Sequence, residues 1–526
     1  MANHINLLPA LMSALQNADC FDHPVDEFTL IETHISYVLL TGLFAYKFKK
    51  NISLDFLDFS TLEKRKYYLD EEYRLNRRLA SALYLGVISI TGSESKPSLT
   101  DKGNSIIEYA LKMVQFPVED QLDNLLDKNK ILIEHIDDLA IELASFHTSL
   151  KPARMDTNYG NVDQIRYPVM ENFDQINPET GEEDLQDMLI HLKEWSADQL
   201  DQLDQNFRQR KQQGFIRECH GDMHLSNMVL IDNKVVIFDC IEFNETFRWI
   251  DVISEIAFTL MDLDFRKRDD MANRLLNTYL ERTGDYASLE LLNFYRIYRS
   301  MVRAKVADIQ RKQTQDSTVK KHLTKKLYDH ISLADHYRQK KQSTFLCITH
   351  GFSGSGKTTY TEQLVDLSGA IRLRSDVERK RLFDLKAKTR AENQVGKGLY
   401  NASVSHETYD QLARFSRLII NVGYPVIVDA TFLEKENRDQ FSKLAEELSL
   451  PFHILDFTAS ISTLEKRIIK RNSIGKDASD ADLVVLKRQL ENNDQISEKE
   501  KQNTLSIDTE KSFNPAEVIS RINTAF

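Results

Sequence analysis

The chain has 526 residues, of which 41% are hydrophobic and 28% are charged, and its formal net charge is −12 at pH 7. The length exceeds what one hydrophobic core usually supports, so two to four domains are expected in a globular protein of ordinary composition. The acidic balance disfavours a non-specific nucleic-acid binder, although a local basic groove is compatible with it.

Cysteine usage and hydropathy favour a cytoplasmic protein. The four cysteines form no CxxC pair, and a disulfide framework is not expected in a chain of this length, so a reducing compartment is favoured. No apolar run approaches the roughly 18 residues of a membrane span, so no membrane partner is predicted. The segment Met1–Leu15 lacks a basic n-region and places its leucines at helical spacing, which favours a packed amphipathic helix over a signal peptide.

The first third of the chain mixes strand-like runs with one helix. Ser36–Tyr46 and Leu83–Thr91 are strand-like, whereas Leu62–Ala80 is charged, lacks Gly and Pro, and has helical periodicity. From about Leu122 to Asp335 helical periodicity dominates, with one strand–turn–strand segment from Phe215 to Phe243.

A polar, basic stretch from Arg311 to Gln342 contains no Gly or Pro, so a helix is predicted there. The domain border is placed near its end, giving domains 1–340 and 341–526. From Phe345 onward, apolar strands alternate with helices, which is typical of βαβ units in a parallel sheet with right-handed crossovers.

One motif lies in the strand–turn–strand segment. His220–Asn227 (HGDMHLSN) is followed by an apolar run that ends at Asp239. This spacing matches the catalytic loop and the metal-binding Asp of protein kinases. Asp222 is therefore the candidate catalytic base, and Asn227 and Asp239 are candidate ligands of two Mg²⁺ ions. His220 is expected to buttress the loop, while His224 either faces the substrate or packs in the core.

This motif resembles the aminoglycoside phosphotransferase family, a branch of the protein-kinase-like fold. The resemblance implies a bilobal α+β domain with a small lobe over about 26–110 and a large lobe over about 111–340. It implies that Lys47, at the end of FAYK, holds the ATP phosphates and pairs with Glu72, with Glu71 as a rival. Alternatively, Lys47 is one solvated lysine beside Lys49 and Lys50.

The same resemblance implies two further positions. Backbone groups of Glu108–Ala110 would form the hinge that reads adenine, and Asp251 would brace the catalytic loop. The small lobe departs from the protein-kinase pattern because no G-x-G-x-x-G motif covers it, and Gly42 is the only glycine nearby.

A second motif, Gly351–Thr358 (GFSGSGKT), matches G-x-x-x-x-G-K-[ST] between an apolar strand and a helix. Its backbone N–H groups and the helix N-terminus favour phosphate, Lys357 is expected to reach the β- and γ-phosphates, and Thr358 is expected to hold Mg²⁺. The motif predicts an ATP–Mg²⁺ site contacted by Gly351, Ser353, Gly354, Ser355, Gly356, Lys357, Thr358 and Thr359.

Two later carboxylates indicate a kinase. Asp376 follows the second strand, where a doubly wound sheet presents its ligand crevice, and it is the candidate base of this site. Arg379, one helical turn on, is the candidate residue that grips an anionic substrate. Asp429 ends the apolar strand Val426–Asp429, where a Walker-B-type carboxylate meets Mg²⁺. In the simpler interpretation, Asp376 and Asp429 cap a helix and a turn.

Arg467 and Arg471 lie four residues apart on one helix face, before the polar stretch Ser473–Asp482. This pattern indicates an arginine lid that stabilises the transferring phosphoryl group, or simply a solvated basic face. The P-loop, Arg374–Asp376 (RSD), VIVDATF and the late KRIIKRNSIGKDASDADL segment resemble the P-loop kinase family that includes polynucleotide 5′-hydroxyl kinases, zeta toxins and small-metabolite kinases. The resemblance covers about Phe345–Phe526 and implies that Asp376 is the base.

With both motifs in this order, the chain resembles bacterial bifunctional aminoglycoside phosphotransferase/ATP-binding proteins, also through Phe56–Leu62 and Arg74–Ala80. Fold does not fix substrate. The prediction is a kinase with two ATP–Mg²⁺ sites acting on a hydroxyl of a small molecule. The alternatives are one catalytic domain with an ATP-sensing partner domain, or a toxin-like kinase acting on nucleic acid or a nucleotide-sugar. The cluster Arg379–Arg381 permits a nucleic-acid substrate, and the net charge disfavours it.

Overall fold

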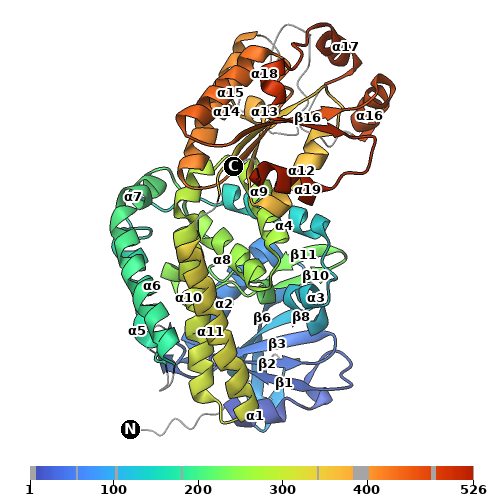
Figure 1. The fold of residues 1–526 in the computed structure, drawn as a ribbon. Coiled ribbons are helices and arrows are strands. Elements are labelled where there is room, and N and C mark those ends of the chain that lie inside the picture. Colours follow the sequence, from blue (N-terminus) through green and yellow to red (C-terminus); the bar gives the residue numbers. More distant parts are fainter. Residues whose placement is uncertain are drawn as a thin grey trace. The chain divides into compact units, whose positions relative to one another are not determined.

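The computed structural model describes residues 8–54, 57–100, 105–178, 182–340, 343–382, 402–474 and 481–524 (Figure 1). It contains two compact units: Met1–Asp138, Ser149–Val169 and Leu200–Thr259 form the first, and Leu139–Thr148, Met170–Gln199 and Leu260–Phe526 form the second. The division passes through the predicted large lobe. The border near residue 340 therefore stays a prediction, and residues 341–342 lie outside the described ranges.

The first unit is built on a six-stranded sheet of order β1-β2-β3-β8-β6-β7, in which all neighbours are antiparallel. The strands are β1 Thr29–Glu32, β2 Ser36–Leu40, β3 Phe44–Lys49, β6 Tyr84–Ser93, β7 Lys96–Ser98 and β8 Ile106–Val114. The predicted single run Ser36–Tyr46 is thus wrong: it is a hairpin that turns at Gly42, whose φ of 89° suits glycine.

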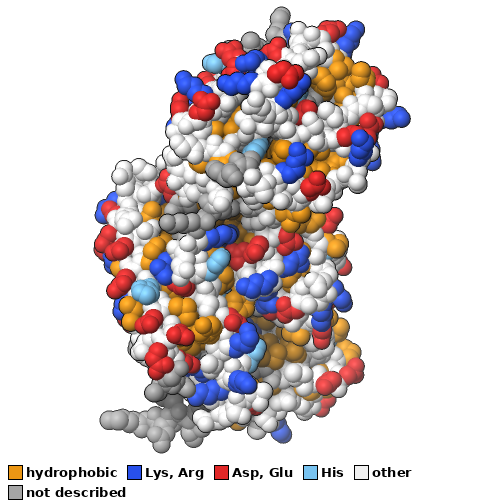
Figure 2. Space-filling view, viewed as in Figure 1, with side chains coloured by type: hydrophobic (Ala, Val, Ile, Leu, Met, Phe, Trp, Pro, Cys, Tyr) orange, Lys and Arg blue, Asp and Glu red, His pale blue; other side chains and the backbone are white. Residues whose placement is uncertain are grey.

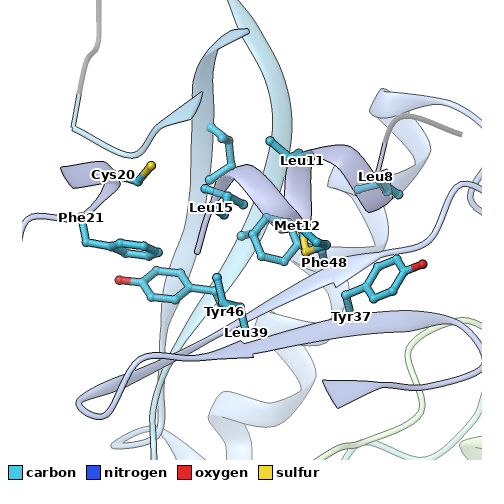
Figure 3. Close-up of a cluster of buried hydrophobic side chains, with 12 residues drawn as sticks. Leu8, Leu11, Met12, Leu15, Cys20, Phe21, Tyr37, Leu39, Tyr46 and Phe48 are labelled. Carbon is cyan, nitrogen blue, oxygen red and sulfur yellow. The ribbon is translucent and has the colours of Figure 1, made fainter. Parts of the chain in front are cut away.

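Successive side chains of strand β3 point to opposite faces of the sheet, and each face is covered by a helix. Tyr46 and Phe48 pack beneath helix α1 (Leu8–Ala14), whose leucines fill a buried cluster (Figure 3). Lys47 and Lys49, on the opposite face, contact Glu72 of helix α2 (Leu62–Ala80). Both predicted helices are confirmed over the described residues.

The hinge predicted at Glu108–Ala110 is wrong. These residues lie in the middle of β8, which pairs with β3 on one side and β6 on the other. Residues 108–110 pair with Ile88–Ile90 of β6, so they belong to the sheet and not to an inter-lobe hinge. Glu108 forms an ion pair with Arg65 at 2.8 Å. The alternating apolar pattern of β8 was mistaken for the end of a helix.

The predicted strand–turn–strand segment is confirmed. Strand β10 (Met228–Ile231) pairs with β11 (Lys234–Ile237), and Asp232 and Asn233 make the turn with φ of 48° and 61°. Strand β9 (Ile216–Glu218) leads into the HGD motif and pairs with β12 (Trp249–Asp251). The flanking helices of this unit are α3 Leu122–Asp127 and α7 Asp204–Gln212, and α4 Ile133–Ser149, α5 Val162–Gln175, α6 Glu183–Gln202 and α8 Val252–Phe265 have residues in both units.

Three long helices of the second unit precede its sheet. They are α9 Asp269–Thr283, α10 Leu289–Gln313 and α11 Ser317–Gln339. The predicted helix in the polar, basic stretch is confirmed by α11, which packs along α10 through a buried stripe that includes Leu327 and Ile331.

A parallel five-stranded sheet of order β14-β15-β13-β16-β17 follows, as predicted for this part of the chain. The strands are β13 Leu346–His350, β14 Ile371–Arg374, β15 Val426–Asp429, β16 Phe452–Thr458 and β17 Thr504–Asp508, the last of which was not predicted. Strands β13 and β15 are buried along their whole length, as in a sheet covered on both faces.

Helices cover both faces of this sheet (Figure 1). Helices α12 (Lys357–Ser368) and α19 (Pro515–Asn523) pack on one face through a cluster that includes Leu364, Leu455 and Ile522. Helices α14 (Ala402–Asn421) and α15 (Lys435–Glu447) pack against β15 and β13. Strands β13, β14 and β15 therefore end together beside the P-loop.

Among the described residues, no helix has both the length and the apolar character needed to cross a membrane. On the face shown in Figure 2, basic and acidic side chains are interspersed over most of the surface.

A buried ion pair secures the strand that follows the HGD motif, and it gives a stability prediction. Arg210 donates two hydrogen bonds to Asp251, at 2.8 and 2.6 Å, and both side chains are at most 5% exposed. Breaking such a pair from one side typically costs about 3–5 kcal/mol. We expect Asp251→Asn to lower the free energy of unfolding by about that amount.

The measurement is guanidinium unfolding followed by fluorescence of Trp249 in a Trp195→Phe background, since the chain has 2 tryptophans. Asp70→Asn is the control because its pair with Lys66 is exposed, with side chains 45–48% accessible, and should cost less than about 1 kcal/mol. Equal effects of the two variants would contradict the prediction.

Candidate functional site

The HGD motif (His220–Asp222) forms a loop that is hydrogen-bonded to helix α8. One carboxylate oxygen of Glu255 accepts the backbone N–H groups of both His220 and Gly221 at 2.7 Å. His220 donates from Nε2 to the carbonyl of Phe238 at 2.9 Å and accepts the Asp222 N–H at Nδ1. Burial lowers the pKa of His220, so the ring is neutral at pH 7. His220 therefore has the geometry of a buttress.

Asp222 and Asn227 lie together, as the motif predicts. The amide of Asn227 donates to the Asp222 carbonyl at 2.9 Å and to its carboxylate at 3.0 Å. The Asp222 side chain is 34% exposed and can meet a substrate. His224 is buried, contacts the Phe258 ring edge-on, and places Nε2 3.2 Å from the Asp222 carboxylate, so it packs and also touches the candidate base.

Glu72 bridges two lysines of β3. Its two carboxylate oxygens lie 2.6 Å from the ammonium groups of Lys47 and Lys49. Lys47 also pairs with Asp239 at 2.7 Å, and Lys49 also pairs with Glu242. The result is a continuous row of alternating charges from Asp239 to Glu242. Glu72 and Lys49 are completely buried.

The row keeps Lys47 charged. Burial alone would lower the pKa of Lys47, but the carboxylates of Asp239, Glu72 and Glu242 raise it well above its usual value. Burial would likewise raise the pKa of Asp239, but Lys47 lowers it below its usual value. The site therefore holds a permanent ammonium beside an ionised carboxylate at pH 7.

The alternatives for this row are settled by the geometry. Glu71 lies toward the surface and pairs with Arg74 at 2.9 Å, and Lys50 pairs with Glu32 at 2.6 Å. Glu72 and Lys47 are therefore the pair that the structure brings together. Lys49 and Glu242 were not singled out from the sequence as partners; the period-2 spacing of Lys47 and Lys49 on one strand is the signal that could have found the first.

Helix α2 also holds the segment around Asp239. Asn76 accepts the Cys240 N–H at 2.9 Å, and Arg78 donates to the carbonyls of Glu218 and Cys219 at 2.5 and 3.0 Å. Asp239 itself has a φ of 64°, which is uncommon for a residue other than glycine and is found at functional sites.

Asp251 was expected to stabilise the HGD loop directly, but its hydrogen bonds stabilise a neighbouring strand. Its carboxylate accepts from Arg210 and from the Ile253 N–H, so it stabilises β12, the partner of β9. The direct brace is Glu255, four residues later on α8, which the sequence interpretation missed. Asp251 and Glu255 both lie in an apolar run of the sequence, so the sequence does not distinguish which of them stabilises the loop.

The P-loop wraps the N-terminus of α12. Gly351, Gly354 and Gly356 have φ of 137°, 84° and 94°, and a Cβ on Gly351 would lie 2.5 Å from the Phe457 carbonyl oxygen. The loop thus needs glycine for its conformation and for its close packing. This cradle fits a phosphate group bound by backbone N–H groups.

Lys357 lies across the P-loop and donates to the carbonyls of Gly351 and Phe352, both at 2.9 Å. Burial lowers its pKa to about 8, an effect that the charge of Asp429 opposes. The Thr358 hydroxyl donates to the Asp429 carboxylate at 2.8 Å. A hydroxyl and a carboxylate oxygen at this spacing fit a Mg²⁺ shell, since Mg²⁺ prefers oxygen ligands.

A cavity of about 1200 Å³ lies over the P-loop. Its lining includes predicted site residues of the C-terminal motifs, namely Ser353, Gly354, Gly356, Lys357, Thr358, Thr359, Asp376, Arg379, Asp429, Arg467 and Arg471. Gly351 and Ser355 are buried residues of the same loop and do not line the cavity. Asp376 is in the first turn of α13 (Ser375–Leu382), 26% exposed, with its carboxylate 3.2 Å from Arg379.

The two arginines of α16 (Ile461–Ile474) are anchored to backbone. Arg467 donates to the carbonyls of Gly354 and Thr509, at 3.3 and 2.9 Å, and Arg471 donates to the carbonyl of Ala481 at 2.6 Å. Residues 475–480 of the expected lid lie outside the described ranges. The lid therefore stays a prediction, whereas the position of both arginines at the cavity is as expected.

Several cavity residues were missed by the sequence interpretation as ligand-facing groups. They are Arg374, His406, Tyr409, Arg488 and Gln489. Gln489 accepts the Ser353 N–H of the P-loop at 2.9 Å. Apart from Arg374, which lies in the RSD segment, these residues come from helices whose spacing carries no motif.

The contrast between the two lysines predicts different pH dependences. Lys357 loses its proton near pH 8, whereas Lys47 keeps its proton well above that. We expect the MgATP affinity of a Lys47→Ala variant, which retains the P-loop site, to fall about tenfold between about pH 7 and pH 9, because ATP must then reprotonate Lys357. Titration calorimetry at both pH values measures this.

A Lys357→Ala variant, which retains the first site, serves as the comparison. Its affinity should change less than about twofold over the same interval, because Lys47 remains protonated. A flat profile for the P-loop site would contradict the assignment of Lys357 as the phosphate-binding ammonium.

Known families match two separate parts of the chain. Residues 120–292 match the Phosphotransferase enzyme family, and residues 346–496 match an AAA domain family. Uncharacterized proteins of Mycobacterium bovis and Mycobacterium tuberculosis are 27% identical over 470 residues, which cover 89% of this chain and 91% of theirs.

Solved kinase structures match parts of the chain. An aminoglycoside 2′-phosphotransferase is 14% identical with a TM-score of 0.35, covering 62% of this chain and 98% of its own. A choline kinase of Cryptosporidium parvum is 11% identical with a TM-score of 0.36 and coverages of 58% and 88%. A sugar kinase of Janibacter is 20% identical with a TM-score of 0.27 and coverages of 34% and 93%. From the family matches, the chain joins an N-terminal aminoglycoside phosphotransferase-like kinase domain to a C-terminal P-loop domain with a parallel sheet.

Proposed function

We propose that this protein is an ATP-dependent phosphotransferase with two kinase sites, each of which transfers the γ-phosphoryl group of ATP to a hydroxyl of a small molecule. The observation that carries the proposal is a shared set of groups. Each site has a solvent-accessible Asp, a second Asp in a position to bind Mg²⁺, and a largely buried lysine. These are Asp222, Asp239 and Lys47 at the first site, and Asp376, Asp429 and Lys357 at the second.

At the first site, Asp222 orients the acceptor hydroxyl and takes its proton. The hydroxyl oxygen then forms a bond to the γ-phosphorus while the bond from that phosphorus to the β–γ bridging oxygen breaks, and ADP leaves. Lys47 neutralises charge on the phosphates, held in place by Glu72. Asn227 and Asp239 would hold Mg²⁺, which when bound neutralises charge on the β- and γ-phosphates.

At the P-loop site, Asp376 has the corresponding role as base, with Arg379 beside it at 3.2 Å. Lys357 and the P-loop backbone bind the phosphates, and Thr358 and Asp429 would hold Mg²⁺. Arg467 and Arg471 supply positive charge where negative charge moves during transfer. The five arginines Arg374, Arg379, Arg467, Arg471 and Arg488 on the cavity wall favour an acceptor that is itself anionic.

The proposal is tested with labelled ATP and a metabolite extract. Wild type should transfer label to small molecules, and Asp222→Asn and Asp376→Asn should each reduce a different labelled product by about 10²–10⁴-fold, the usual contribution of a general base. Asp232→Asn and Asp439→Asn are matched controls, because both carboxylates are exposed and lie outside the two sites.

Other outcomes would favour one of the alternative functions. Loss of all products in one variant and an unchanged product pattern in the other would make the second domain an ATP sensor. Label transferred only to added RNA or DNA would replace the small-molecule acceptor with a nucleic-acid one. Failure of wild type to label any product or hydrolyse ATP would overturn the proposal.

A further inference from the structure

Helix α9 lies within the segment that matches the Phosphotransferase enzyme family, yet it packs against the P-loop domain inside the second unit. Residue 281 falls within the match at 120–292 and outside the match at 346–496. Its helix contacts α12 and strand β14. Asn277 of α9 donates to the Ala370 carbonyl at 3.0 Å and accepts the Arg372 N–H at 2.8 Å, so the helix is fixed to the first residues of β14.

Glu281 of the same helix bridges two arginines of β14. Its carboxylate oxygens lie 3.1 Å from Arg372 and 2.9 Å from Arg374, and all three side chains are at most 14% exposed. The arginines are two positions apart, so the strand presents both on one face. Burial alone would raise the pKa of Glu281, but Arg374 and Arg372 hold it at about 2, so the carboxylate stays charged at pH 7.

Arg374 connects this pair to the P-loop site. Its Nε lies 3.8 Å from the Asp429 carboxylate oxygen that accepts the Thr358 hydroxyl, and its side chain lines the cavity. The guanidinium of Arg374 thus lies between two carboxylates and is closer to Glu281 than to Asp429. If Glu281 were neutral, the buried guanidinium would be drawn to Asp429 and would compete with a cation for that carboxylate.

We infer that Glu281 is a positioning residue of the P-loop site: by holding Arg374 it leaves Asp429 available to Mg²⁺. The inference rests on the proposed function of this site as a MgATP-binding kinase site. It means that the P-loop domain is completed by a helix from the neighbouring family segment. Residues that orient a metal ligand from outside the coordination shell typically change metal affinity 10–100-fold when they are replaced.

The test uses the full-length chain with Lys47→Ala in every variant, so that the first site is silenced. Binding of a fluorescent ATP analogue is titrated over a range of free Mg²⁺ concentrations and again in EDTA. We expect Glu281→Gln to raise the Mg²⁺ concentration for half-maximal enhancement of binding by about 10–100-fold. In EDTA its affinity should stay within about twofold of the parent, since the phosphate cradle is intact.

Removal of Arg374, which would compete with Mg²⁺ for Asp429, should reverse the rise in the Mg²⁺ requirement. The double variant Glu281→Gln, Arg374→Gln should return the Mg²⁺ requirement to that of Arg374→Gln alone, because the two residues act through one contact. Arg274→Gln is the matched control: Arg274 is on the same helix and pairs with Glu362 and Asp366 of α12. It should leave the Mg²⁺ requirement unchanged.

Three results would overturn the inference: an unchanged Mg²⁺ requirement in Glu281→Gln, an equal loss of affinity with and without Mg²⁺, or no reversal by Arg374→Gln. If Glu281→Gln does not fold, Glu281→Gln, Arg372→Gln removes one charge of each sign, still releases Arg374, and should show a raised requirement relative to Arg372→Gln alone. That reference accounts for the hydrogen bond from Arg372 to the Thr358 carbonyl at 3.1 Å. If the parent shows no Mg²⁺-dependent binding that Lys357→Ala abolishes, the proposed function of the P-loop site fails, and this inference fails with it.

Discussion

A largely buried glutamate that bridges two cations of one strand occurs at both candidate sites. Glu72 of α2 joins Lys47 and Lys49 of β3, and Glu281 of α9 joins Arg372 and Arg374 of β14. In each case the two cations are separated by one residue, because alternate side chains of a strand share a face. In each case one of the cations also approaches an aspartate that we propose as a Mg²⁺ ligand: Lys47 lies 2.7 Å from Asp239 and Arg374 lies 3.8 Å from Asp429.

The placement of the other groups follows from this constraint. Removal of such a carboxylate would take a counter-charge from two largely buried cations at once, which costs several kcal/mol. The bridge therefore fixes a helix against a strand and sets the position of the cation that meets the aspartate. At the first site, helix α2 also binds Cys240 through Asn76, and through Arg78 it binds β9, the strand that leads into the HGD motif. At the second, α9 fixes β14, which leads directly into α13 with Asp376 in its first turn.

Much of the fold could be predicted from the sequence. The helix Leu62–Ala80 and the alternation of strands and helices after Phe345 have long, regular patterns, and the GFSGSGKT and HGDMHLSN motifs fix their own loops by glycine and hydrogen-bonding requirements. The misses have local causes. Gly42 is one glycine in an apolar run, so the hairpin it makes was not recognised, and β8 was not recognised as a strand.

The site residues also divide into those that could be predicted from the sequence and those that could not. Asp222, Asp239, Lys357 and Thr358 belong to motifs whose spacing the chemistry requires, Asp429 ends an apolar strand, and Lys47 was implied by the family resemblance. The structure places Lys47 beside Asp239 and Thr358 beside Asp429. Glu255, Glu242 and Glu281 contact site residues from far along the chain or from a helix with no motif. Their roles depend on tertiary packing, which the spacing of one sequence does not encode.

The stoichiometry of MgATP binding tests most directly whether one chain binds two nucleotides. Equilibrium dialysis of the full-length protein with a non-hydrolysable ATP analogue and Mg²⁺ should saturate at two nucleotides per chain. Lys47→Ala and Lys357→Ala should each reduce this to one, and the double variant should reduce it to zero. Saturation of wild type at one nucleotide per chain, removed entirely by either single variant, would contradict the account.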